Sequence, residues 1–110
     1  MQTSTIVSPK VSRAVGTALT QVGAYSPATS CVVTGLCVAN ITGSTVNVTV
    51  TVYDGTNDTH LCSATPVASG DSLLLGADWF KFTLVSGWSI RVQSSVASSV
   101  DASMFVTEFT

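Results

Sequence analysis

Charged side chains are scarce in this chain of 110 residues: Asp, Glu, Lys and Arg together account for 9% of it, and there is a single histidine. Serine and threonine take the place of the missing charges, so we expect a neutral surface that is rich in hydroxyl groups. A net charge of −2 produces little long-range repulsion between copies. This composition suits a protein that packs against other proteins, and we expect that it is not an enzyme.

Basic residues are too few and too scattered for a nucleic-acid-binding surface. The chain has four of them, Lys10, Arg13, Lys81 and Arg91. No segment approaches the roughly 18 consecutive apolar residues of a membrane-spanning helix. The first residues have no basic stretch followed by an apolar one, which a secretory signal requires. We therefore expect a protein that is made in a cytoplasm and binds neither nucleic acid nor membrane.

The cysteines are few and odd in number: Cys31, Cys37 and Cys62. Cys31 and Cys37 lie six residues apart in one strand-like run, which places them about 20 Å apart. A disulfide needs a Cα separation of about 4.4–6.8 Å. No Cys-x-x-Cys pair indicates a metal site. We expect three free thiols that serve as small buried hydrophobic residues, and no cofactor or metal.

Residues 46–53 alternate between valine at even positions and Asn, Thr or Tyr at odd positions. Successive side chains of a strand point to opposite faces, so this pattern predicts a strand with one buried face. The buried row is expected to contain Val46, Val48, Val50 and Val52. The opposite face is expected to carry Asn47, Thr49 and Thr51.

Strand-like segments recur about every ten residues, separated by turns rich in Gly, Asp, Asn and Ser. Pro66 marks the segment 60–67 as an edge strand, because proline cannot donate to a neighbouring strand. The expected strands are 31–41, 46–53, 60–67, 72–75, 80–85, 88–93 and 101–109. This rhythm predicts an all-β, single-domain antiparallel β-sandwich or jelly roll of seven or eight strands, with almost no helix.

Residues 1–30 are less regular than the rest and are punctuated by two prolines and two glycines. We expect an extended N-terminal arm here, with one strand around 11–19, followed by the sandwich domain at 31–110. The β-branched Ile6 and Val7, with Lys10 and Arg13, are candidate interface residues that would add a strand to a neighbouring subunit. Such an arm would become ordered only where a partner supplies contacts.

No catalytic or metal-binding constellation stands out. His60 follows a polar turn and is expected to be exposed, and no Gly-x-Ser-x-Gly motif marks a nucleophile. Asp54 and Asp58 lie in a predicted turn, where Asp bonds to the local backbone. With Asn57 they lack the spacing and the closing Glu of a calcium-binding loop. Catalytic, cofactor and metal residues are therefore predicted to be absent.

The tryptophans are candidate interface anchors. In the run 79–82, alternation places Phe80 and Phe82 on the core side with Leu84, and Trp79 on the other. Trp79 and Trp88 then point outward or lie at the end of the sandwich. An exposed Trp on a charge-poor surface is typical of an interface, although capping the end of the core explains the same pattern.

Three runs, 41–53, 67–75 and 84–92, resemble small virion proteins of tailed bacteriophages. In those proteins a strand, an apolar-x-x-Gly-[Asp/Trp] turn and a short apolar strand recur. Here the turn reads Val67-Ala68-Ser69-Gly70-Asp71 and Leu84-Val85-Ser86-Gly87-Trp88. The resemblance covers about residues 31–110 and carries over no functional residue.

The resemblance implies a capsid decoration or cement protein of the phage head. Its partners would be the major capsid protein or other virion proteins, with homo-oligomer formation, and its location would be the virion after assembly in the host cytoplasm. Two alternatives stay open: a component of the phage neck, tail or head fibre, and a carbohydrate- or receptor-binding module. Copy number per particle separates the first two, and glycan binding would favour the third.

Overall fold

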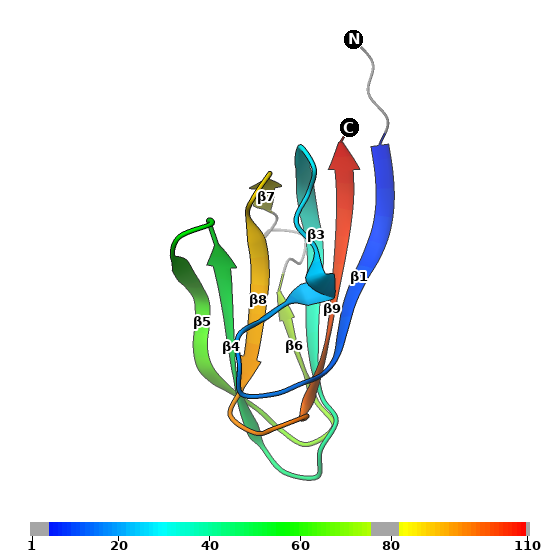
Figure 1. Cartoon of the computed structure of the whole chain (residues 1–110). Coiled ribbons are helices and arrows are strands. Elements are labelled where there is room, and N and C mark those ends of the chain that lie inside the picture. The colour runs from blue at the N-terminus through cyan, green and yellow to red at the C-terminus, as the bar shows by residue number, and fades with distance from the viewer. Residues whose placement is uncertain (1–4, 76–81, 110) are drawn as a thin grey trace.

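The computed structural model describes residues 5–75 and 82–109 (Figure 1). Within them lie one 3₁₀ turn, η1 (Val22–Ala24), and no α-helix, so no helix there is long and apolar enough to span a membrane. The described strands are β1 (Thr5–Val15), β2 (Thr20–Gln21), β3 (Ser30–Asn40), β4 (Val46–Tyr53), β5 (Asp58–Val67), β6 (Ser72–Leu75), β7 (Phe82–Val85), β8 (Ser89–Ser94) and β9 (Val100–Phe109).

Two antiparallel sheets face each other. The first has the order β1-β9-β3, and both β6 and β7 pair with the far side of β3. β6 lies beside Leu36–Ala39 and β7 beside Ser30–Val33, so the two short strands share one position in the sheet. The second sheet has the order β2-β8-β4-β5. This arrangement, with two sheets of four strand positions each, is a jelly-roll sandwich, which confirms the predicted fold class.

Most predicted strands lie within two residues of their observed bounds, and β4 matches 46–53. Two differences occur near the N-terminus. The first strand spans Thr5–Val15 instead of 11–19, and the two-residue strand β2 was not predicted. The described residues therefore contain nine strands rather than seven or eight, because a strand as short as β2 leaves no periodicity in the sequence.

The expected N-terminal arm is part of the sandwich from residue 5 onward. β1 pairs with β9 from Thr5 opposite Phe109 to Val15 opposite Val100 (Figure 1). Val15, Val22 and Tyr25 are buried in the core. β1 pairs within its own chain, so the segment from residue 5 onward contributes a strand to the sandwich.

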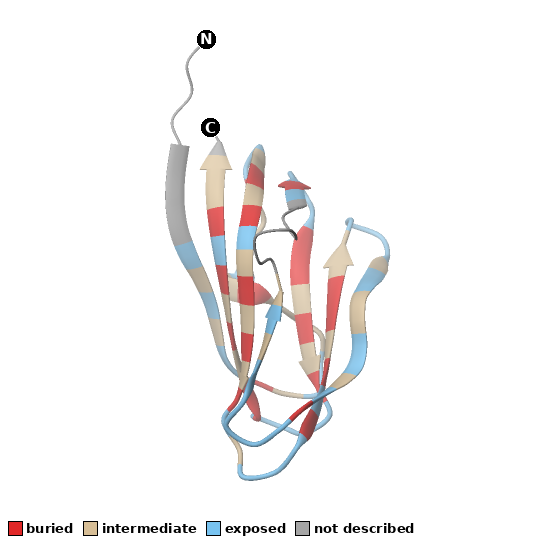
Figure 2. Ribbon diagram, turned by 180° about the vertical axis from the view of Figure 1, so that it is seen from behind, coloured by how far each residue is buried: buried red, intermediate tan, exposed pale blue. Residues whose placement is uncertain are grey.

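The core lies between the two sheets and is dominated by valine. Figure 2 shows buried residues alternating with more exposed ones along the long strands. The predicted row is confirmed for Val46, Val48 and Val50, and Val52 is half-buried. The buried hydrophobic residues are Val15, Val22, Tyr25, Cys31, Val33, Leu36, Val38, Val46, Val48, Val50, Val67, Leu84, Ile90, Val92, Val100, Ala102, Met104 and Val106.

Thr51 departs from the prediction for the outer face, because it is fully buried there. Its hydroxyl donates a hydrogen bond of 2.8 Å to Asp58 Oδ1. Arg91, opposite Thr51 in the register, pairs with Asp58 Oδ2 at 3.3 Å and stacks 3.6 Å from the centre of the Tyr53 ring. Thr51 is thus buried on the outer, solvent-facing side of the sheet, because polar side chains cover it.

Gly23, in η1, lies against β1, and this position favours glycine for two reasons. Its φ is +63°, in the left-handed region, and an added Cβ would lie 2.8 Å from the Cβ of Lys10. Glycine tolerates this backbone conformation without the steric penalty of other residues. Gly43, in contrast, has no other atom within 4 Å of the position of a Cβ.

Gly23→Ala is therefore expected to lower the free energy of unfolding by about 1–3 kcal/mol, because it adds both backbone strain and a clash with β1. Gly43→Ala should stay within about 0.5 kcal/mol of the wild type. Denaturant-induced unfolding measures both changes. Equal losses in the two variants would show that η1 does not pack closely against β1.

Val50 and Thr49 are adjacent on β4 and test the register of the strand. Val50 is fully buried, whereas Thr49 lies on the outer face and its hydroxyl accepts a 3.0 Å hydrogen bond from the Ala64 N–H. An unpaired carboxylate in the core costs several kcal/mol, against a total stability of about 5–15 kcal/mol. We expect Val50→Asp to be unfolded and Thr49→Asp to remain folded in circular dichroism; similar behaviour of the two would contradict this register.

Candidate interaction surface

The candidate interface residues near the N-terminus lie on β1. In the backbone register Ile6 lies opposite Glu108 and Val7 opposite Thr107 of β9. Lys10 is half-buried, with its Nζ 4.5 Å from the centre of the Tyr25 ring. Arg13 is exposed. Lys10 therefore contacts its own chain, and Arg13 is the N-terminal candidate whose side chain is seen to be accessible.

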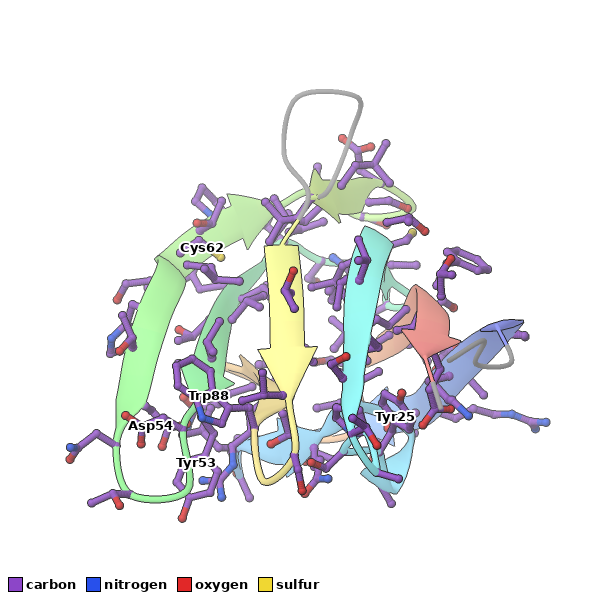
Figure 3. All side chains as sticks on the ribbon, turned by 90° about the horizontal axis from the view of Figure 1, so that it is seen from above. Tyr25, Tyr53, Asp54, Cys62 and Trp88 are labelled. Carbon is purple, nitrogen blue, oxygen red and sulfur yellow. The ribbon has the colours of Figure 1, made fainter. Side chains whose placement is uncertain are left out.

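Trp88 does not lie with these residues. Trp79 lies outside the described residues. Trp88 precedes β8 of the second sheet and is 37% exposed, and its carbonyl accepts a 2.7 Å hydrogen bond from Ser26 Oγ. Viewed along the strands, Trp88 lies near Tyr53 and Asp54, away from Tyr25 (Figure 3). The described candidates are thus spread over both sheets and form no single patch.

The edge strands carry features that oppose pairing with another chain. β1 contains Pro9 and a register shift between Ser12 and Val15, where Ala14 has a φ of +52° and its N–H donates to Asp101 Oδ1 at 2.8 Å. Prolines and β-bulges are common devices against edge-to-edge association. The edge of β1 is therefore a poor template for the strand addition that we expected of the N-terminal arm.

β5, at the edge of the second sheet, is protected in the same way. It contains Pro66, as predicted for an edge strand, and its pairing with β4 has two register shifts. At one of them Ala64 has a φ of +49°. Since both long edges are interrupted, the broad outer faces of the sheets are the better candidates for protein contacts.

The outer face of the second sheet is polar. It carries the Arg91–Asp58 ion pair on β8 and β5, together with Asn47 and Thr49 of β4. His60, on β5, is exposed, as the sequence predicted. Asp54, in the turn after β4, accepts hydrogen bonds from the N–H groups of Asn57 (2.7 Å) and Thr56 (2.9 Å), and these bonds lower the pKa of its carboxyl group.

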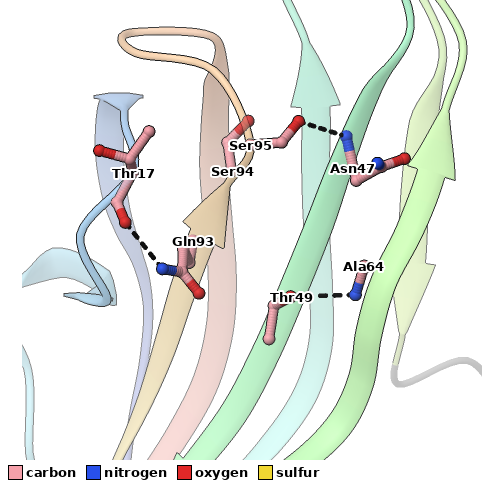
Figure 4. Close-up of a pocket in the computed structure, with 7 residues that line it drawn as sticks. All are labelled: Thr17, Asn47, Thr49, Ala64, Gln93, Ser94 and Ser95. Carbon is pink, nitrogen blue, oxygen red and sulfur yellow. Dashed lines mark hydrogen bonds between the residues drawn. The ribbon is translucent and has the colours of Figure 1, made fainter.

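A hollow of about 370 Å³ lies on this polar face (Figure 4). Gln93 Nε2 donates to the Thr17 carbonyl at 2.7 Å, and Ser95 Oγ accepts from the Asn47 N–H at 3.0 Å. It has neither a charged nor an aromatic residue in its described lining, which consists of Thr17, Asn47, Thr49, Ala64, Gln93, Ser94 and Ser95. The residues described contain no cluster of three metal-binding side chains either. The hollow thus offers hydrogen bonds but no acid, base or metal ligand.

The outer face of the first sheet carries exposed apolar side chains, with serine and threonine between them. The strand register places Val11 of β1, Ser103 of β9, Cys37 of β3 and Leu74 of β6 in one row across the sheet. Leu74 is 71% exposed and Val11 is 54% exposed. We define the apolar face as the outward-facing hydrophobic residues of this sheet: Val11, Val32, Cys37, Leu74, Val85 and Phe105.

Phe105 occupies the next row of the apolar face. It is 47% exposed and lies opposite Gly35 of β3, where a Cβ would contact the Phe105 ring at 3.7 Å. Among the described residues, the charged side chains that the register assigns to this outer side are Arg13 and Asp101, at one end of the sheet. The centre of the face thus combines methyl, thiol and aromatic groups with the hydroxyl of Ser103.

Sequence reasoning did not identify this face, although one signal was present. The run 31–41 is apolar at both alternating sets of positions, which is typical of a strand that is covered on both sides. Its inward side chains, including Cys31, are buried, and its outward ones include Val32 and Cys37. β3 thus has apolar side chains on both of its faces. The inward ones are buried in the core of this chain, and the outward ones form part of the apolar face.

The prediction of free thiols is confirmed for all three cysteines. Their burial differs from the prediction, because Cys31 is buried whereas Cys37 and Cys62 are half-buried. Cys62 packs against the core, and its thiol lies 3.7 Å from the Val48 carbonyl. Cys37 instead lies within the apolar face.

Among the described residues, Tyr25 is the buried residue whose side chain has an unpaired polar atom: the residue is 8% exposed, and its hydroxyl has no hydrogen-bond partner there. Burial raises the pKa of the Tyr25 phenol, and the nearby Cys31 thiol and Glu108 carboxylate raise it further. Burial also raises the pKa of the Cys31 thiol. Both groups are therefore neutral at physiological pH.

Tyr25→Phe is expected to leave stability unchanged or higher at pH 7, because it removes an unpaired buried hydroxyl. Above the ordinary tyrosine pKa of about 10, the unfolded chain loses the phenol proton while the folded chain retains it, so the wild type is destabilised as the pH rises. The stability difference between Tyr25→Phe and wild type should therefore grow above pH 10. Urea unfolding between pH 7 and 11 measures it, and parallel curves would contradict the raised pKa.

No protein-family model matches the chain, and no curated protein matches it. Among solved structures, the fold is similar to one from work titled "Bacillus endospore appendages form a novel family of disulfide-linked pili". The TM-score is 0.57 at 16% sequence identity, over 99% of this chain and 91% of the other. At this identity the similarity shows a shared fold.

Proposed function

We propose that this protein is a non-enzymatic structural subunit of a tailed-phage particle, specifically a decoration or cement protein that binds the capsid in many copies. The observation that carries the proposal is the apolar face. Exposed apolar patches that extend over several strands mark protein contacts in soluble proteins. Leu74, Val11 and Phe105 would lose their contact with water when subunits assemble.

The contrast between the two outer faces supports this role. The second sheet presents an ion pair, amides and hydroxyls to solvent, whereas the first sheet presents large apolar side chains, among them Leu74, Val11 and Phe105, with serine and threonine between them. A subunit with one polar and one apolar face can expose the polar face to solvent while the apolar face contacts neighbouring proteins. The interrupted edges of β1 and β5 restrict association to the faces, which favours a defined assembly over open-ended aggregation.

The phage context rests on the resemblance of 67–75 and 84–92 to small virion proteins. Both runs contain the same turn: the Asp71 N–H donates to the Ala68 carbonyl and the Trp88 N–H to the Val85 carbonyl, each at 3.0 Å. Gly70 and Gly87 both have positive φ values, of 75° and 89°. The recurring motif is thus a turn that leads into a strand, once in each sheet, so it supports the proposal at the level of fold.

A fibre is the second candidate. The structurally similar protein is described as belonging to disulfide-linked pili, and a phage neck, tail or head-fibre component would also be a polymer or a small ring. A carbohydrate-binding role has less support, because exposed aromatic residues usually accompany the hydrogen-bonding groups of such sites, and the described lining of the hollow has none. We therefore propose assembly onto the phage head as the main function.

The test uses phage particles and purified protein. Quantitative mass spectrometry should find hundreds of copies per particle for a head protein, against about a dozen for a neck or tail component. Purified Leu74→Asp should bind about tenfold more weakly to particles assembled without the protein, because it places a charge in the apolar face. Val96→Asp, at an exposed site in the loop after β8, should bind like the wild type. Absence of the protein from particles would contradict the proposal.

A further inference from the structure

We infer that the partner of the apolar face is a second copy of this chain, so that two sandwiches pack their first sheets together. This inference rests on the proposed function and names the contact that it uses. Three observations carry it: the size of the face, its charge, and the state of its polar groups.

The face is large enough for a stable dimer. β9 has ten residues, so the sheet is about 34 Å long, and four strand positions at about 4.8 Å make it about 19 Å wide. Each copy would therefore bury about 600 Å², or about 1,200 Å² for the pair. This lies at the lower end of the range of about 1,200–2,000 Å² for specific interfaces.

The charge of the face is compatible with its own copy. The charged residues on the described part of this side are Asp101, by the register, and Arg13, by alternation along β1, and they have opposite signs. A face with charges of one sign would repel an identical face, and the apolar face has no such charge. Association with a copy therefore meets no repulsion between like charges at the centre of the face.

Two polar groups on the face form hydrogen bonds within the chain. Asp101 Oδ1 accepts a hydrogen bond from the Ala14 N–H at 2.8 Å, and Thr34 Oγ1 donates to the Phe105 carbonyl at 3.2 Å. Removing water from groups that keep these bonds is less costly than removing it from unpaired ones. The apolar row can then pack against an identical row, as the faces of two stacked sheets do.

Cys37 reports on this contact because it lies in the inner part of the row, between Ser103 and Leu74. Stacked sheets lie about 10 Å apart, so a two-fold axis that passes near this row brings the two Cys37 thiols close to each other. The chain also supplies a matched control: Cys62 is a free, half-buried thiol of the second sheet that packs against the core.

The experiment combines sedimentation equilibrium of the purified full chain with crosslinking by a short bis-maleimide. The wild type and Cys62→Ala should form a crosslinked dimer, and Cys37→Ala should not. Leu74→Asp and Phe105→Asp should raise the dimer dissociation constant about tenfold or more. Val96→Asp, which is 45% exposed outside the face, should leave it unchanged. Circular dichroism confirms that each variant is folded.

The outcomes separate this inference from the proposed function. A monomeric wild type with no Cys37 crosslink, whose protein nevertheless binds particles, would overturn the self-contact and leave the structural role standing, with another virion protein on the face. A dimer that is insensitive to both Asp variants would also overturn it, because the contact would lie elsewhere. A Cys37-crosslinked dimer that never binds particles would support the self-contact and contradict the proposed function.

Discussion

Backbone pairing of β3 with three other strands holds the first sheet together. β9 pairs along one side of β3, and β6 and β7 divide the other side between them. The inward side chains of β3, including Val33, Leu36 and Val38, contribute to the core. Its outward side chains contribute to the apolar face, so this one strand links the stability of the fold to its candidate interaction surface.

The two sheets have outer faces of different chemistry. On the second sheet, Arg91 joins Asp58 and Tyr53, and these contacts hold a polar layer over β4. On the first sheet, Gly35 and the ring of Phe105 leave a surface without charges at its centre. The bulges and prolines of β1 and β5 make the edges unsuitable for adding strands. The outer faces, rather than the edges, are therefore the better candidates for protein contacts.

Local patterns in the sequence predicted much of the fold. The alternating valines predicted β4 and its buried face, Pro66 predicted an edge strand, and the odd cysteine count predicted free thiols. Prediction failed where the outcome depended on distant residues. Thr51 is buried because Asp58 and Arg91 cover it, and β1 is ordered because β9 lies beside it. The candidate interface residues were chosen one by one and lie on different elements.

The sequence by itself determined the class of the fold, because alternation and turn residues act over a few neighbouring positions. It also determined the neutral, hydroxyl-rich surface, which follows from composition alone. The tertiary structure decided which strands became neighbours, and so which outward residues form a common surface. Val11, Cys37, Leu74 and Phe105 are far apart in the chain, and the pairing of β1, β9, β3 and β6 brings them together. Such a surface arises from long-range backbone hydrogen bonds, which leave no periodicity in any one segment.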